Sequence, residues 1–78
     1  MKENELIQLI KKSLKTKQKI DINSKSNNIE EWDSVGHLIL LSNLDKQLKG
    51  ATSNIADIAT ADSVKKIINI LKKNKLIK

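Results

Sequence analysis

Apolar residues recur every three or four positions in three segments of the chain, and this is the spacing of an α-helix. The first segment runs from Glu3 to Leu14. Its apolar residues are Leu6, Ile7, Leu9, Ile10 and Leu14. Acidic residues lie near its start and lysines near its end, as the helix dipole favours. The pattern predicts an ordinary core helix over residues 3–14.

The second segment, residues 34–48, contains the most apolar run of the chain. Its predicted core stripe is Leu40, Leu41, Leu44 and Leu48, with His37 on the same line one turn earlier. The opposite stripe consists of Val35, Leu38, Ile39, Ser42 and Lys46. This stripe is too apolar for a simply solvated face, so it either contacts a partner or adds to the core. Its place beside Ser34 favours partner contact.

A third helix is predicted near the end of the sequence, with Thr60 or Asp62 as its N-cap. Its apolar stripe is Val64, Ile67, Ile68 and Leu71. Before it, Gly50 is expected to end the second helix in a left-handed conformation. Residues 55–59 are expected to form one short helical turn that covers the open end of the bundle. Residues 72–78 are rich in lysine, and we expect them to be a basic tail that frays.

Residues 16–32 are polar and lack a helical period, and they form a long connection for so small a protein. The apolar residues expected to pin this loop to the core are Ile20, Ile22, Ile29 and Trp32. Asp21 and Asn23 favour a turn, because their side chains can form hydrogen bonds with the nearby backbone. The sequence therefore predicts a single all-α domain over residues 1–78. It is a small bundle of three main helices plus one short helix, with a long loop between the first two helices.

Composition excludes several classes of site. The 78 residues include no cysteine, one histidine and a single aromatic residue, Trp32. A disulfide framework and a thiolate metal site are therefore excluded, and an enclosed substrate pocket would be hard to build. No apolar run approaches the ~20 residues that span a bilayer, and residues 1–14 lack the apolar core of a secretion signal. We expect a cytoplasmic monomer without stable membrane insertion.

The net charge is +6, and all fifteen cations are lysines. One interpretation is an anionic partner, either a nucleic acid or a membrane surface. The other is a compositional bias, because Lys, Asn and Ile are abundant together. The chain has no arginine for bidentate contacts to guanine and no set of aromatic residues for base stacking. These absences favour the compositional bias and predict no nucleic-acid partner.

Asp33 and Ser34 lie where the polar loop gives way to the most apolar helix. Asp33 is predicted to cap that helix by accepting hydrogen bonds from free N–H groups of its first turn. Ser34 then becomes the first helical residue, with its hydroxyl near the surface. An anion attached there would be favoured by about 0.3–1 kcal/mol through the helix dipole. The position suits a serine that carries a phosphate and does not suit a serine nucleophile that works alone.

The sequence Asp33-Ser34-Val35, preceded by Trp32 and followed by an apolar helix, resembles the Asp-Ser-Leu attachment motif of acyl carrier proteins. The wider stretch, residues 31–38, resembles the variant found in carriers that serve dedicated biosynthetic pathways. The predicted order of elements is also similar to that of the family. The resemblance implies that Ser34 carries a 4′-phosphopantetheine arm, derived from coenzyme A, whose thiol holds acyl cargo as a thioester. It implies a role in lipid, fatty-acid or secondary-metabolite biosynthesis.

The resemblance further implies a protein without catalytic activity of its own. Its partners would be a phosphopantetheinyl transferase, which reads Asp33 in the attachment site, and acyl-loading and acyl-transfer enzymes. The implied docking face comprises Val35, Leu38, Ile39 and Ser42. The interior that receives an acyl chain would be lined by Leu40, Leu41, Leu44, Ile58, Ile67, Ile68 and Leu71. In the family a short third helix moves to admit such chains.

One departure from the family concerns charge. Carriers of the common fatty-acid type have an acidic second helix, whereas the corresponding outer positions here include Gly36, Ile39, Lys46 and Gln47. By resemblance, this predicts a dedicated set of partners in place of standard fatty-acid synthesis enzymes. His37 has two interpretations, a general base or gate near the arm and a half-buried helix residue. The second is favoured because no further catalytic group lies at a suitable spacing.

Three alternatives remain beside the acyl carrier. The cargo of the same mechanism could be an aminoacyl or peptidyl group. The protein could instead be a small basic helical domain that binds nucleic acid, or a structural interaction domain with an unmodified Ser34. Ser63 also follows an aspartate, so local sequence alone leaves it as a second modification candidate. The long loop before Ser34 and the longest apolar helix after it favour Ser34.

Overall fold

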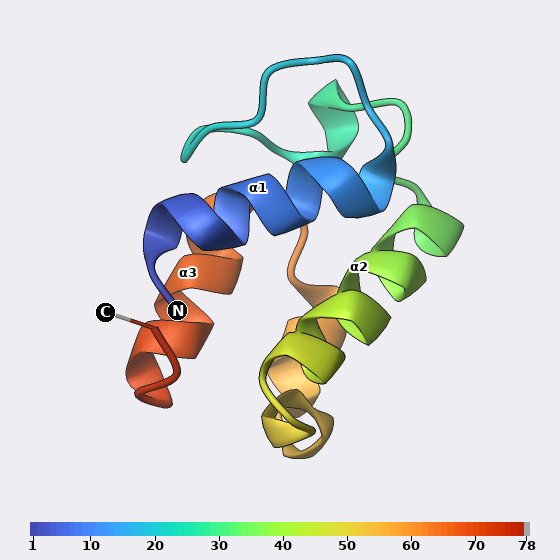
Figure 1. The fold of residues 1–78 in the computed structure, drawn as a ribbon. Helices are drawn as coiled ribbons and strands as arrows, with labels where there is room; N and C mark the ends of the chain where they lie inside the picture. Colours follow the sequence, from blue (N-terminus) through green and yellow to red (C-terminus); the bar gives the residue numbers. More distant parts are fainter. Residues whose placement is uncertain (78) are drawn as a thin grey trace.

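Three α-helices form the framework of the structure, a computed structural model that describes residues 1–77. They are α1 (Glu3–Leu14), α2 (Ser34–Gln47) and α3 (Val64–Lys73). α1 lies across α2 and α3, and the long loop that leaves α1 arches back over it before α2 begins (Figure 1). The predicted all-α bundle of three main helices is confirmed. None of the helices within residues 1–77 combines the length and the apolar character that crossing a membrane requires.

The core is built from the apolar stripes that helical spacing predicted. Its fully buried large side chains come from all three helices and are Leu6, Ile10, Leu40, Leu44, Val64, Ile67 and Leu71. Burial of each such side chain stabilises the fold by about 1.5–3 kcal/mol. Polar contacts also join the helices, because Asn43 Nδ2 donates to Ser13 Oγ at 2.9 Å between α2 and α1.

The long loop is pinned to the core by three of the four residues predicted for that role. Ile20, Ile29 and Trp32 are buried, whereas Ile22 is 42% exposed, so the prediction for Ile22 is wrong. The predicted turn explains the difference. Asp21 Oδ1 accepts a hydrogen bond from Asn23 N at 2.8 Å, and this turn places Ile22 at its outer tip.

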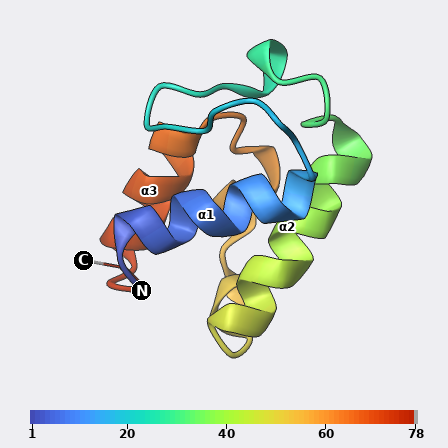
Figure 2. The ribbon, with the colours of Figure 1, turned by 45° about the horizontal axis from the view of Figure 1, so that its top comes forward.

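An antiparallel bridge ties the same loop to the start of α3. Val64 N donates to Ser24 O at 3.0 Å, and Ser26 N donates to Asp62 O at 2.8 Å. Figure 2 shows the loop running above the beginning of α3. The loop is therefore held near its middle by the bridge to α3 and at its end by the start of α2.

Three short 3-10 helices complete the chain where one short helix was predicted. They are η1 (Ser26–Asn28), η2 (Ala51–Asn54) and η3 (Ala56–Thr60), of which η3 corresponds to the predicted turn. As expected, η3 covers the core with a buried Ile58. η2 forms because the Asp45 carboxylate accepts hydrogen bonds from Thr52 Oγ1 at 2.6 Å and Thr52 N at 3.2 Å. That long-range cap has no local sequence signature.

Lysines take the left-handed positions at the ends of all three helices. Lys15, Lys49 and Lys75 have φ values of 52°, 56° and 59°. Gly50, predicted as the left-handed residue that ends α2, follows Lys49 and has a φ of 84°, with its N–H donating to Asp45 O at 2.8 Å. The helix therefore uses a lysine where glycine is usual, which costs about 1 kcal/mol of backbone strain.

Replacement of Lys75 by glycine should raise the free energy of unfolding by about 0.5–1 kcal/mol, because glycine adopts the left-handed conformation without strain. Urea unfolding measures this change. The matched control is Lys12→Gly, an exposed lysine inside α1, which should lower stability by about 0.5–1 kcal/mol. A loss of stability in Lys75→Gly would contradict the prediction.

The predicted basic tail, residues 72–78, begins inside α3. Lys72 and Lys73 form its last turn, and Lys72 Nζ lies 3.1 Å from Glu3 Oε1 of α1. Leu76 N then donates to Leu71 O at 2.8 Å, and Ile77 is buried. Leu76 and Ile77 thus pack against the core, whereas residues 72–75 are exposed, and Lys78 lies outside the described residues.

Candidate functional site

The start of α2 has the geometry predicted from the sequence. Asp33 adopts an extended conformation, and its Oδ1 accepts a hydrogen bond from Gly36 N at 2.8 Å. Ser34 follows as the first helical residue and is exposed. The cap role of Asp33 and the surface position of Ser34 are confirmed. The Ser34 hydroxyl therefore lies at the positive end of the helix dipole.

The other serine that follows an aspartate has a different environment. Ser63 is 7% exposed, and its Oγ accepts a hydrogen bond from Lys66 N at 3.1 Å as the N-cap of α3. An enzyme can reach the exposed Ser34 hydroxyl, whereas the Ser63 hydroxyl is covered and already bonded. The local sequence does not distinguish Ser34 from Ser63 as a modification site. Their solvent exposure does, because only Ser34 is accessible to an enzyme.

Gly36 is buried, so its assignment to the outer face of α2 is wrong. A Cβ atom at this position would collide with the carbonyl oxygen of Glu31 and would lie 3.0 Å from Leu14 Cδ2. The first turn of α2 thus presses against the loop just before it and against the end of α1. The one sequence signal for this contact is a glycine inside a helix, where it is otherwise unfavourable.

Trp32 and His37 form a hydrogen-bonded pair beside Ser34. Trp32 is 4% exposed, which confirms its interpretation as a packing anchor. Its Nε1–H donates to His37 Nδ1 at 3.0 Å, and the two rings stack with centroids 6.2 Å apart. An indole nitrogen donates only, so His37 Nδ1 is the acceptor and the proton of the neutral ring is on Nε2. His37 Nε2 then donates to Ile58 O at 3.1 Å.

Both ring nitrogens of the half-buried His37 are therefore engaged with the protein itself. This arrangement matches the interpretation of His37 as a half-buried helix residue. It leaves neither nitrogen free to accept a proton from a substrate while both bonds persist. No local sequence pattern indicates the contact with Ile58, because the two residues lie 21 positions apart.

A groove of about 540 Å³ runs beside Ser34 between the start of α2 and the end of η3. Its lining residues include Ser34, Trp32, His37, Leu38 and Leu41 on one side and Ala59, Thr60 and Asp62 on the other. Asp62 lies 2.9 Å from Lys66 Nζ. The hydrogen bond and the positive charge of Lys66 hold the pKa of Asp62 below the ordinary aspartate value. Carboxylates thus lie on both sides of the groove, Asp62 on the far side and Asp33 beside Ser34, while Trp32, Leu38 and Leu41 give the near side its apolar surface.

The residues predicted to line an acyl-receiving interior form a filled core. Leu40, Leu44, Ile58, Ile67, Ile68 and Leu71 are buried in one hydrophobic cluster, and Leu41 packs against it partly buried. Of these seven, only Leu41 also lines the groove beside Ser34. A chain attached to Ser34 therefore meets the groove first and reaches the interior only if core side chains move.

The predicted docking face points outward. Val35, Leu38 and Ile39 are 64%, 67% and 44% exposed, and Ser42 is also exposed. The alternative that these apolar residues add to the core is wrong. We call Val35, Leu38, Ile39 and Ser42 the α2 ridge. An exposed apolar ridge of this kind is typical of a surface that another protein covers.

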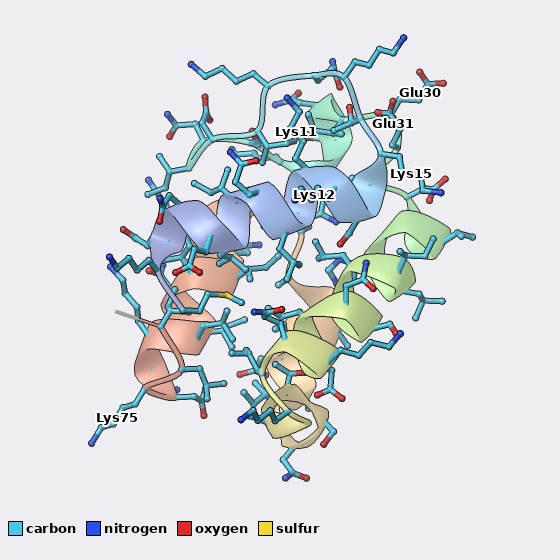
Figure 3. All side chains as sticks on the ribbon, viewed as in Figure 1. Lys11, Lys12, Lys15, Glu30, Glu31 and Lys75 are labelled. Carbon is cyan, nitrogen blue, oxygen red and sulfur yellow. The ribbon has the colours of Figure 1, made fainter. Side chains whose placement is uncertain are left out.

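Charges around the α2 ridge are unevenly placed. Asp45 is half-buried and its carboxylate binds Thr52, so it is engaged inside the protein. Glu30 and Glu31 are exposed and point outward above the start of α2, with Lys15 on the neighbouring end of α1 (Figure 3). The free carboxylates nearest the ridge therefore lie at its Ser34 end and belong to the loop.

A second groove, of about 550 Å³, lies between the long loop and the start of α3. Three lysines line it, Lys25, Lys65 and Lys66, together with asparagine side chains and the exposed Ile22. This is the basic surface that the nucleic-acid interpretation would require. It is separated from the Ser34 groove by the backbone bridge between Lys25 and Ser63.

Among residues 1–77, no three His, Cys, Asp or Glu side chains are grouped so as to hold a metal ion. Comparison of the chain with known protein families, with curated proteins and with solved structures found no match. The residues of the site, their geometry and the motif they form are therefore what points to a function.

Proposed function

We propose that this protein is an acyl carrier whose Ser34 bears a 4′-phosphopantetheine arm. The observation that carries the proposal is the exposed hydroxyl of Ser34, directly after the capping carboxylate of Asp33 at the start of α2. A phosphopantetheinyl transferase would join the Ser34 oxygen to the phosphorus nearest the pantetheine of coenzyme A. Adenosine 3′,5′-bisphosphate would leave, and the hydroxyl proton would pass to the transferase or to solvent.

The environment of Ser34 favours the product of that reaction. The phosphodiester carries a negative charge, and a helix N-terminus stabilises such a charge by about 0.3–1 kcal/mol. The Asp33 carboxylate opposes this effect by repulsion, but its Oδ1 is bound to Gly36 N. The arm ends in a thiol that holds acyl cargo as a thioester, and the protein itself supplies no catalytic group. An aminoacyl or peptidyl cargo would use the same mechanism.

The α2 ridge would be the docking face for the transferase and for enzymes that load or remove the acyl group. Its centre is apolar, and the free carboxylates near it are those of Glu30 and Glu31. We expect partners with an apolar contact surface and cationic side chains close to the Ser34 end. Enzymes that recognise an acidic second helix should therefore act slowly on this carrier, which transfer assays with fatty-acid synthesis enzymes would test.

Leu38→Ser should lower kcat/KM of the transferase for this protein about tenfold, because the lost apolar contact is worth roughly 1–2 kcal/mol. Stability should change by less than about 0.5 kcal/mol, since Leu38 is mostly exposed. The control is Gln47→Ala, an exposed residue at the other end of α2, which should load like the parent protein. Equal loading of Leu38→Ser and the parent would remove Leu38 from the docking face.

The proposal is tested by incubating the protein with coenzyme A and a broad-specificity phosphopantetheinyl transferase, followed by intact-mass measurement. Carrier function predicts a gain of one phosphopantetheine group per chain. An unchanged mass, under conditions in which an established carrier is fully loaded by the same enzyme, would reject it.

The second groove is the specific observation that favours the rival function, nucleic-acid binding. Its lysines, Lys25, Lys65 and Lys66, would then contact phosphates. In that case affinity for DNA or RNA should fall steeply with salt, and Lys65→Ala should reduce the salt slope by about 1. Weak binding without such a slope, together with a phosphopantetheine mass gain, would favour the carrier.

A further inference from the structure

His37 joins three parts of the chain that surround Ser34. It belongs to the first turns of α2 and accepts a hydrogen bond from Trp32 at the end of the long loop. Through Nε2 it also holds the carbonyl of Ile58, which is the residue of η3 that enters the core. We call His37 and these two hydrogen bonds the His37 latch.

Besides Ile58, η3 is held by the apolar residues that flank it, Ile55 and Ala61, and by contact with α3. It is five residues long, and no side chain caps its start. Ile58 is its one buried residue, while its other four residues are exposed. A 3-10 helix also has poorer hydrogen-bond geometry than an α-helix, so short pieces depend on their packing. Within η3 itself, the contacts with the rest of the protein come from two groups of Ile58, its side chain in the core and its carbonyl at His37.

η3 is also what separates the Ser34 groove from the core. Residues at the end of η3 form one wall of the groove, and Trp32 and His37 lie on the opposite side. Ile58 is packed in the same cluster as Leu40, Leu44 and Leu71. Leu41 lines the groove and packs against the same cluster, so Leu41 and Ile58 are the side chains that an alkyl chain would have to displace to enter the core.

We propose that His37 is a positioning residue that latches η3 to α2 and thereby keeps a chain attached at Ser34 in the open groove, outside the core. This inference rests on the proposed carrier function. With the latch closed, a thioester on the arm stays accessible to water and to enzymes whatever the length of its acyl group. With the latch broken, η3 opens more often, and longer chains withdraw into the core.

The variant His37→Phe tests the latch most directly, because a phenyl ring keeps the stack on Trp32 and removes both hydrogen bonds. Gln47→Ala is the matched control on the same helix, away from the groove. If circular dichroism shows that His37→Phe does not fold, His37→Leu, which also makes neither hydrogen bond, takes its place. Each protein is loaded with acetyl- or octanoyl-phosphopantetheine from the corresponding acyl-coenzyme A, and hydroxylamine cleavage of the thioester is timed.

In the parent protein and in Gln47→Ala, the acetyl and octanoyl thioesters should be cleaved at equal rates. In His37→Phe, the octanoyl thioester should be cleaved up to about twofold more slowly than the acetyl thioester, because loss of a hydrogen bond raises a small withdrawn population about two- to tenfold. Equal rates in all three proteins would overturn the latch. The latch would also be overturned if the octanoyl thioester were cleaved more slowly than the acetyl thioester by the same factor in the parent and in His37→Phe.

Hydrogen exchange on the unloaded protein gives a second readout. The amides of Ile58 and Ala61 make the hydrogen bonds within and after η3. They should exchange about two- to tenfold faster in His37→Phe and at the parent rate in Gln47→Ala. Unchanged exchange in His37→Phe overturns the latch even when loading succeeds. Failure of all three proteins to gain mass would instead reject the carrier function, so the two failures are distinguishable.

Discussion

Ser34→Ala will abolish phosphopantetheine attachment and leave the fold intact. The substitution removes the only oxygen at this position that can form the phosphodiester. Ser34 is exposed at the first position of α2, where alanine is well tolerated, so we expect stability to change by less than about 0.5 kcal/mol. Intact mass after treatment with coenzyme A and transferase, together with a thermal melt, measures both expectations.

Ser63→Ala is the control for this experiment and should behave in the opposite way. It keeps the Ser34 hydroxyl and should load fully, but it removes the N-cap of α3 and should lower stability by about 1 kcal/mol. A mass gain that persists in Ser34→Ala and disappears in Ser63→Ala would move the attachment site to α3.

Gly36→Ala should destabilise the protein by about 2 kcal/mol, the typical cost of forcing a methyl group into a packed site. The new Cβ collides with a backbone atom, the Glu31 carbonyl oxygen, and meets Leu14 Cδ2 at 3.0 Å. The collision is relieved only if the loop segment that precedes Ser34 moves. Attachment of phosphopantetheine by the transferase should therefore also slow. Urea unfolding and initial loading rates measure the two effects.

The sign of this result is decisive, because alanine has a higher helix propensity than glycine by about 1 kcal/mol. At a solvated position on the outer face of α2, where the sequence first suggested Gly36 to lie, the same change would stabilise the protein. Gln47→Ala at an exposed site in α2 provides that comparison, and it should be neutral or slightly stabilising. An increase in stability for Gly36→Ala would show that α2 and Glu31 are not in contact.

The features that the sequence predicted well are those set by residues close together in the chain. Helical spacing of apolar side chains identified the three α-helices and most of the core. The cap at Asp33 and the turn at Asp21 depend on hydrogen bonds that reach two or three residues ahead, so residue type and position were enough. The outward α2 ridge followed from the same helical geometry.

The features that the sequence did not predict depend on contacts between distant segments. A helical wheel places Gly36 relative to one stripe, but it does not show that the preceding loop returns to cover it. The bond from His37 to Ile58 and the bond from Asp45 to Thr52 likewise join separate elements. The groove beside Ser34 lies between segments far apart in the chain, so the sequence did not predict it, and the residues that the resemblance assigned to an acyl-receiving interior pack together as core.

A count of free thiols tests the carrier assignment most directly, because the chain has no cysteine. The purified protein should show no thiol with a chromogenic thiol reagent. After treatment with coenzyme A and transferase, and removal of small molecules, it should show one thiol per chain, located by fragment masses on Ser34. A protein that still shows no thiol, while an established carrier treated in parallel gains one, would contradict the account.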